Sequence, residues 1–304
     1  MHESVLLTES IKYLNLNSKS IIVDCTLGYG GHSSHILKNI KDGYLYAFDQ
    51  DQEAIKFADK RLKKVGNNYE IIHTNFVNIK KELTSRNVKA DGILFDLGVS
   101  SPQLDEAWRG FSFHKDAPLD MRMDIRQDLN AKDIVNNYSK DELESIIEKY
   151  GEEKYASSIA RGITKAREEK PIETTLELAE IIKNSVPEKY RRQAHPARKT
   201  FQAIRIAVND ELNVFEKTLK EALDLIKVGG RICVITFHSL EDRTCKRIFN
   251  EVSSIPKQLQ NLPIIPDEYK PKYKVIANIK PTDQEINNNP RARSARLRVI
   301  ERSL

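Results

Sequence analysis

A glycine-rich turn between an apolar run and a helical pattern is the feature of this sequence that most restricts its fold. Residues 20–26 (SIIVDCT) are apolar and β-branched, residues 28–31 (GYGG) interrupt them, and residues 33–40 have helical spacing. Glycine lets a backbone approach a ligand closely, and the N–H groups at the start of the following helix are free to bind it. The segment therefore predicts a strand, a ligand-binding turn and a helix.

The alternation of strand and helix continues through the first hundred residues and returns near the C-terminus. Such alternation is typical of a parallel sheet covered by helices on both faces. Further strands are expected at residues 44–49, 69–74, 92–95, 231–237, 274–279 and 295–301, and further helices at 52–65 and in the stretch that ends at Leu225. The last two strands are expected to form an antiparallel pair.

The middle of the chain has a different pattern. Capping boxes of the form Ser/Thr-x-x-Glu begin helices at Ser139 and Thr174, and Gly151 is the expected C-cap of the first of them. We therefore expect an α/β fold, a doubly wound sheet interrupted by a helical insertion. The predicted domains are residues 1–104 together with 202–304, and an inserted helical domain at residues 105–201.

Composition excludes several classes of protein. Of the 304 residues, 39% are hydrophobic and 31% charged, and mean hydropathy is -0.53, as in a globular chain with a sizeable core. No apolar run approaches the roughly 20 residues of a membrane helix, and the first ten residues do not resemble a signal peptide. We expect a cytoplasmic protein. Its three scattered cysteines predict neither a disulfide framework nor a metal site.

The residues around the glycine turn distinguish between nucleotide-like cofactors. Gly28 and Gly30 match the dinucleotide fingerprint GxGxxG, but Ser33 replaces its third glycine. Asp24 ends the first strand just before the turn, where a carboxylate would repel a pyrophosphate. S-adenosylmethionine carries an ammonium, a sulfonium and a ribose diol without phosphate, so these residues favour it. An oxidoreductase that uses a nicotinamide cofactor is the alternative.

Two acidic residues and an aromatic residue follow later strands. Asp49 can accept hydrogen bonds from both ribose hydroxyls, and Asp96 can meet the amino acid portion of the cofactor or the methyl acceptor. Phe76 either lies against adenine or belongs to the core. Ligands of open α/β sheets bind beyond the carboxyl ends of the strands, so these residues predict one cofactor site.

Longer motifs extend over the whole chain and carry a resemblance to a known family. They are His2, Val5-Leu6-Leu7 and Glu9, GYGGHS from Gly28, DLGVSSPQLD from Asp96, RGFSF from Arg109, PLDMRM from Pro118, HPARKTFQAIRIAVNDEL from His195, FHSLEDR from Phe237 and NPRARSARLR from Asn289. In their content and order, these motifs closely resemble the bacterial ribosomal RNA small subunit methyltransferase H (RsmH/MraW) family.

The resemblance implies a class I, Rossmann-like methyltransferase sheet with an inserted helical domain that docks RNA. It implies methylation, from S-adenosylmethionine, of the exocyclic N4 of a cytidine in the decoding centre of 16S rRNA, at rRNA position 1402. The implied partner is 16S rRNA within the small ribosomal subunit, and no membrane is expected as a partner. The matching cofactor-binding residues are Gly30, Gly31, His32, Asp49, Phe76, Asp96 and Gln103.

Cytosine N4 is a poor nucleophile because its lone pair is conjugated with the ring. An acceptor near N4 would favour its reactive form and take its proton, and Asp96, the expected catalytic residue, or a backbone carbonyl of residues 98–102 can serve. Methylation at C5 would need a cysteine thiolate, but all three cysteines fall in expected strands or in an expected helix. His32 and His238 flank turns, where histidines usually have a structural role.

Two stretches without acidic residues indicate where RNA phosphates could bind. Such a run is either a solvated face or a phosphate contact, and two runs flanking one site favour contact. The first holds Arg191, Arg192, Arg198 and Arg205 among its basic residues, and the second holds Arg291, Arg293, Arg296 and Arg298. A non-catalytic factor for ribosome assembly is a further alternative, which the intact acids at the strand ends disfavour.

Overall fold

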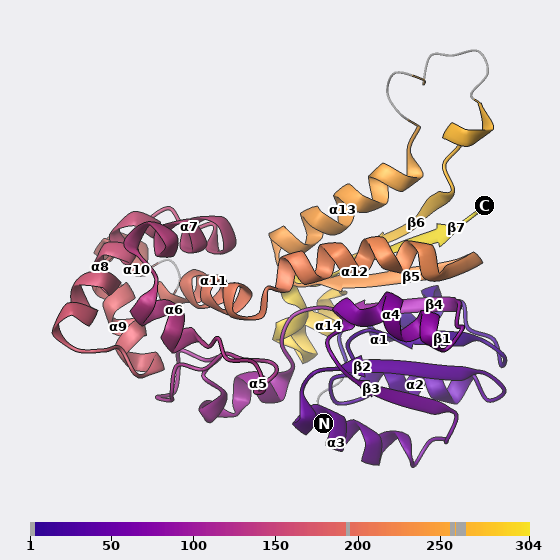
Figure 1. Cartoon of the computed structure of the whole chain (residues 1–304), viewed down its shortest axis with the longest axis horizontal. Coiled ribbons are helices and arrows are strands. Elements are labelled where there is room, and N and C mark those ends of the chain that lie inside the picture. The colour runs from indigo at the N-terminus through magenta and orange to yellow at the C-terminus, as the bar shows by residue number, and fades with distance from the viewer. Residues whose placement is uncertain (1–3, 193–194, 256–258, 260–265) are drawn as a thin grey trace. The chain divides into compact units, whose positions relative to one another are not determined.

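A computed structural model of the chain describes residues 4–192, 195–255, 259 and 266–304. The chain forms two compact units (Figure 1): unit 1 comprises residues 1–98 and 212–304, and unit 2 comprises residues 99–211. Both boundaries expected from the sequence, 104/105 and 201/202, fall inside unit 2. The reason is packing, because Leu104 and Val208 belong to the same hydrophobic cluster as the helices of unit 2.

A seven-stranded sheet forms the centre of unit 1. Its strands are β1 (Ile21–Asp24), β2 (Tyr44–Asp49), β3 (Tyr69–His73), β4 (Ala90–Asp96), β5 (Ile226–Thr236), β6 (Tyr273–Ile279) and β7 (Arg296–Arg302). The strand order is β3-β2-β1-β4-β5-β7-β6. Strands β1 to β5 pair in parallel, and β7 is antiparallel to both β5 and β6. This arrangement confirms the doubly wound sheet and its antiparallel C-terminal pair.

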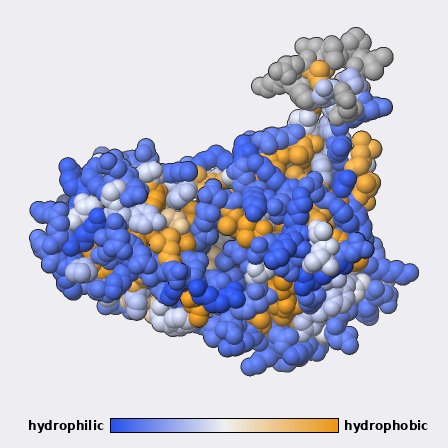
Figure 2. Space-filling model, in the orientation of Figure 1, coloured by the Kyte–Doolittle hydropathy of each residue, from blue (hydrophilic) through white to orange (hydrophobic). Residues whose placement is uncertain are grey.

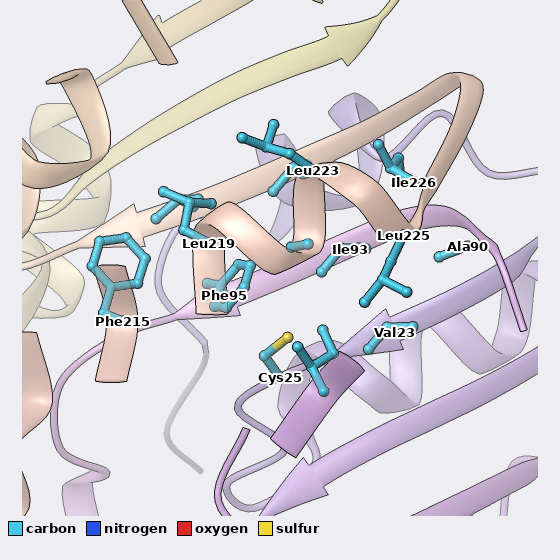
Figure 3. Close-up of a cluster of buried hydrophobic side chains, with 14 of the residues drawn as sticks. Val23, Cys25, Ala90, Ile93, Phe95, Phe215, Leu219, Leu223, Leu225 and Ile226 are labelled. Carbon is cyan, nitrogen blue, oxygen red and sulfur yellow. The ribbon is translucent and has the colours of Figure 1, made fainter. Parts of the chain in front are cut away.

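Helices cover both faces of this sheet. One hydrophobic cluster contains α1 (Leu7–Tyr13), α2 (Gly31–Asn39) and α3 (Gln52–Leu62), and the other contains α4 (Ile79–Ser85), α12 (Glu211–Leu225) and α13 (Ser239–Ser253). Side chains alternate between the clusters along β4, since Ile93 and Phe95 join the second and Leu94 joins the first. Figure 3 shows Phe215 and Leu219 of α12 lying over β4 beside Phe95. Both faces are therefore buried, as the apolar strands predict.

The remaining elements of unit 1 are short. They are η1 (Phe76–Asn78), η4 (Asp267–Tyr269), α14 (Asp283–Asn288) and η5 (Pro290–Ser294). The polar stretch that the sequence places at residues 255–272 lies mostly outside the described residues.

Strand β5 begins five residues earlier than the sequence predicts, at Ile226 instead of Arg231. Ile226 pairs with Ala90 and Arg231 pairs with Gly92, so the chain between them bulges out of the register. Gly229 lies in this bulge with a φ of +79°, a conformation that favours glycine. The Gly-Gly pair therefore marks a bulge inside the strand.

Unit 2 is helical and has its own core. Its elements are α5 (Ser101–Asp105), η2 (Ala107–Arg109), α6 (Ala131–Asn137), α7 (Lys140–Gly151), α8 (Ala156–Glu169), α9 (Thr175–Asn184), α10 (Glu188–Arg191) and α11 (Ala197–Asn209). The capping boxes predicted at Ser139 and Thr174 are both present, at the starts of α7 and α9. Figure 2 shows mainly hydrophilic residues on the visible face of these helices.

The prediction that Gly151 is the C-cap of this helix is wrong. Glu152 takes the left-handed conformation, with a φ of +48°, and Gly151 is the last residue of α7. A Cβ at Gly151 would lie 2.8 Å from the carbonyl oxygen of Lys199 in α11. Glycine is needed here for the close approach of two helices.

Among the described residues, no helix is both long and apolar enough to cross a membrane.

Candidate functional site

Three carboxylates lie at the carboxyl ends of neighbouring strands in unit 1. Asp24 ends β1, Asp49 ends β2 and Asp96 ends β4. Asp24 pairs in register with Ala47 of β2 and Leu94 of β4, so Asp49 and Asp96 extend two residues further on either side of it. The parallel sheet therefore gathers these acids at one edge, where open α/β sheets bind their ligands.

The segment that follows β1 and contains the glycine turn is hydrogen-bonded to the ends of both β2 and β4. Gly28 and Gly30 have φ values of +49° and +74°, and Gly30 is the N-cap of α2. The Gly28 N–H donates to Asp49 Oδ2 over 2.7 Å. On the other side, the Asp96 N–H donates to Thr26 Oγ1, also over 2.7 Å. These bonds hold Gly30, Gly31 and the first turn of α2 next to both acids.

The carboxylate of Asp49 is held by backbone groups on both oxygens. Oδ2 accepts from Gly28 and Oδ1 accepts from the N–H of Asp51, at 2.8 Å. Burial nevertheless raises the pKa of Asp49 to about 6, because it outweighs these bonds. Each oxygen keeps a second lone pair for a ligand. The side chain is therefore an oriented acceptor of the kind that a ribose diol requires.

Asp24 has a different role from the one expected. It is completely buried, Oδ2 accepts from the hydroxyl of Ser33 over 2.6 Å, and Oδ1 accepts from the N–H of Thr26 over 3.0 Å. Burial raises its pKa against the opposing effect of Ser33. Asp24 thus fixes the glycine turn to α2 from inside and does not face a ligand. The sequence marked Ser33 only as a departure from the dinucleotide fingerprint.

His32, in the first turn of α2, faces Asp96. Its Nδ1 lies 3.4 Å from Asp96 Oδ2, and the side chains are 5% and 26% exposed. Burial lowers the pKa of His32, but the hydrogen bond and charge of Asp96 and the charge of Asp24 outweigh it, so the pKa is raised overall. One atom of the pair, Asp96 Oδ1, is buried without a hydrogen-bond partner among the described residues. No sequence pattern indicated this contact.

Phe76 and Gln103 lie in different units. Phe76 packs edge-on against Phe95, with ring centroids 5.9 Å apart, and is partly buried against the core of unit 1. It follows β3, so the same sheet carries it near the acids. Gln103 belongs to unit 2, where its Oε1 accepts from the Ser100 N–H in the capping box of α5. Its contact with a cofactor stays a prediction.

Comparison with known proteins identifies the family. The MraW methylase family model matches residues 1–303. The chain belongs to the MraW methylase family. The ribosomal RNA small subunit methyltransferase H of Exiguobacterium sibiricum is 54% identical over 99% of this chain and 98% of its own. An rRNA methylase structure from Streptococcus thermophilus matches 97% of this chain and 95% of its own, at 14% identity and a TM-score of 0.46.

The thiols of this methylase are unsuited to act as nucleophiles. Cys25, Cys233 and Cys245 are all buried and free. Burial raises the pKa of Cys233 to about 12 and also raises the pKa values of the other two thiols. A thiolate is the nucleophilic form. The structure therefore disfavours C5 methylation for the same reason as the sequence.

The arginines of the two acid-free runs differ in what they contact. Arg205 pairs with Glu211 over 2.8 Å, and both side chains are largely buried. Arg298 is buried and donates to both oxygens of Asp242, at 2.7 and 3.0 Å. These two arginines therefore stabilise the methylase and do not present a free charge to RNA. Side chains that remain exposed are Arg192, Arg198, Arg291 and Arg293.

Proposed function

We propose that this methylase transfers a methyl group from S-adenosylmethionine to the N4 of a cytidine in 16S rRNA, at position 1402 of the decoding centre. The observation that carries the proposal is the site at the strand ends. There a glycine turn is bonded to Asp49, and Asp96 Oδ1 has no hydrogen-bond partner among the described residues. The name of the 54% identical relative supports small-subunit rRNA as the substrate. We further propose that the methylase acts in the cytoplasm on the small ribosomal subunit.

The residues at the strand ends fit S-adenosylmethionine better than a dinucleotide. Asp49 and Asp96 give the site a negative charge, which suits an ammonium and a sulfonium and opposes a pyrophosphate. Asp49 would hold the ribose hydroxyls and Phe76 would lie against adenine. The backbone of Gly30, Gly31 and His32 and the side chain of Gln103 complete the proposed set of contacts. The cofactor supplies a methyl group already activated by positive sulfur.

Asp96 is the best acceptor for the N4 proton. Asp96 Oδ1 has no hydrogen-bond partner among the described residues, and a carboxylate can take up a proton near neutral pH far more readily than a backbone carbonyl of residues 98–102. A hydrogen bond from N4 to Asp96 would turn the nitrogen lone pair toward the methyl carbon. The bound cofactor would supply the methyl group and retain the electron pair of the broken C–S bond. Asp96 would receive the N4 proton and release it to water.

Unit 2 would hold the surrounding RNA. Arg198 is exposed, and Arg192 is exposed and forms an ion pair with Glu188. Arg191, which is partly exposed, donates from Nε to the backbone carbonyl of Val186. A cytidine in structured RNA must leave its stack to reach an enclosed methyl donor, so phosphate contacts on both sides would help to hold it.

The reaction is tested with purified small subunits that lack the methyl group. Labelled S-adenosylmethionine should transfer its label to 16S rRNA, and mass spectrometry of the digested RNA should find methyl on cytidine N4. A C5 product would reject the mechanism, and no transfer would favour an assembly factor. Calorimetry should show binding of S-adenosylmethionine and not of NAD.

The RNA surface is tested by charge removal. Replacing Arg191, Arg192 and Arg198 with Ala should weaken RNA binding and flatten the dependence of log affinity on log salt by about 0.7 to 0.9 per lost contact. A matched control removes three lysines of unit 2 that pair with nearby glutamates: Lys132, Lys140 and Lys170. A folded arginine variant with the wild-type salt slope would move the RNA contact to Arg291 and Arg293.

A further inference from the structure

A buried oxygen without a partner lies at the end of β4 in unit 1. Among the described residues, no hydrogen-bond partner is found for Oδ1 of Asp96. His238, beyond the end of β5, differs because its Nε2 lies 3.1 Å from Glu241 Oε1. A buried polar atom without a partner costs about 1 to 3 kcal/mol. A fold keeps such atoms where a ligand or a reaction uses them.

His32 differs from the other histidines in the groups that surround its ring. His32 is 4% exposed, and three groups from different segments act on its ring. They are the carboxylate of Asp96 on β4, the carboxylate of Asp24 on β1 and the backbone of Val5 in the N-terminal segment. Asp24 is already bonded to Ser33 and Thr26, so Asp96 is the one carboxylate that His32 can orient.

We infer that His32 is a positioning residue, whose Nδ1–H holds Oδ2 of Asp96 and so leaves Oδ1 to receive the amine proton of the substrate. This inference rests on the proposed role of Asp96. A carboxylate can rotate about its Cβ–Cγ bond and exchange its two oxygens. The backbone of Asp96 is fixed through Thr26, and the donor on His32 fixes the remaining rotation.

The helix supports this role. His32 is the second residue of α2, whose N-cap is the left-handed Gly30, so its backbone is set by the same turn that would hold the cofactor. We therefore assign the predicted cofactor contact of residue 32 to its backbone, which leaves the side chain for Asp96. Cofactor affinity and methyl transfer should respond differently to changes in this side chain.

Nuclear magnetic resonance tests the contact without using activity. In protein labelled with ¹⁵N-histidine, the His32 pKa should fall when Asp96→Asn removes the carboxylate charge, since that charge favours the imidazolium. His35 is the internal reference, because it lies on the same helix and its Nδ1 bonds to the Gly31 carbonyl. An unchanged His32 titration in folded Asp96→Asn would overturn the inference.

Two substitutions of His32 separate positioning from bulk. His32→Asn keeps a donor near the place of Nδ1, whereas His32→Leu removes it at similar volume. We expect His32→Leu to lower the single-turnover methylation rate at saturating S-adenosylmethionine by about 10- to 100-fold. Its cofactor affinity should change by less than about threefold. His32→Asn should recover most of the rate, and His35→Asn should match wild type.

The outcomes distinguish this inference from the proposed function. A folded His32→Leu variant with the wild-type rate, or an Asn variant as slow as Leu, would overturn the positioning role. A rate loss recovered by more cofactor would do the same. If His32→Leu does not fold, the resonance experiment decides. If the wild type puts no methyl on cytidine N4, the proposed function fails, and the resonance experiment still shows whether His32 and Asp96 interact.

Discussion

Asp49 should make cofactor binding depend on pH in a range where most carboxylates do not titrate. Burial raises its pKa to about 6, while Gly28 and Asp51 donate to its two oxygens. Above pH 6 it is ionised and accepts hydrogen bonds from the ribose hydroxyls. Below pH 6 it is protonated, and one of its oxygens becomes a donor. Affinity for S-adenosylmethionine should therefore fall as the pH falls through 6.

The size of the effect follows from the pKa of Asp49. If the ionised form alone binds the ribose, the fall from pH 7 to pH 5 is about tenfold, or about 1.4 kcal/mol, given a pKa of about 6. The same shift acts on stability with the opposite sign. Because the folded pKa lies above the unfolded value of 3.8, the stabilising contribution of Asp49 is present below that value and is lost as pH rises through 6.

Isothermal titration calorimetry at pH 5, 6 and 7 measures this dependence. Buffers with different ionisation enthalpies should reveal proton release on binding near pH 5.5. Asp49→Asn should bind weakly at every pH and lose most of the dependence, whereas Asp59→Asn, on the surface of α3, should keep it. Equal wild-type affinity at pH 5 and pH 7 would refute the assignment of Asp49 to the ribose.

Three further outcomes test the packing of the two units. Gly151→Ala should cost about 1 to 3 kcal/mol in urea unfolding of unit 2, because its Cβ would meet the Lys199 carbonyl, and an unchanged unfolding midpoint would contradict this steric cause. Asp242→Asn should cost about 2 to 4 kcal/mol, since it leaves the buried Arg298 without its carboxylate, and an unchanged midpoint would mean that water replaces the pair. The three buried thiols should react with a thiol reagent only as fast as the protein unfolds, and rapid native labelling would contradict their burial.

Most of the fold could be predicted because its signals are local. Apolar runs of strand length predicted the strands, and the Ser139 and Thr174 capping boxes were visible within four residues of sequence. The early start of β5 could not be seen, because Ile226 becomes a strand residue only by pairing with Ala90. Gly151 was misread for a similar reason, since its neighbour Lys199 lies on another helix. The predictions were wrong where the conformation of a residue depends on a contact with a residue far away in the sequence.

The candidate site, too, was predictable only in part. That Asp49 and Asp96 lie together follows from the topology of a parallel sheet, so the sequence was sufficient. The direction in which each of these side chains points could not be predicted from the sequence. Asp24 ends a strand in the same way as the other two acids, yet it turns inward to Ser33. The pair of His32 and Asp96 depends on the placement of the first turn of α2 beside the end of β4, which no sequence spacing reveals.

The interrupted sheet also has a consequence for how the chain is made. Asp91 of β4 pairs with Lys227, which follows it by 136 residues. A ribosome adding about 5 to 20 residues per second needs about 7 to 27 s to produce the intervening chain. During that time β1 to β4 are complete, but the edge of β4 has no neighbour, and its apolar residues 92–95 are an exposed template for pairing with another nascent chain. The length of the insertion thus sets how long each newly synthesised molecule is open to aggregation before β5 arrives.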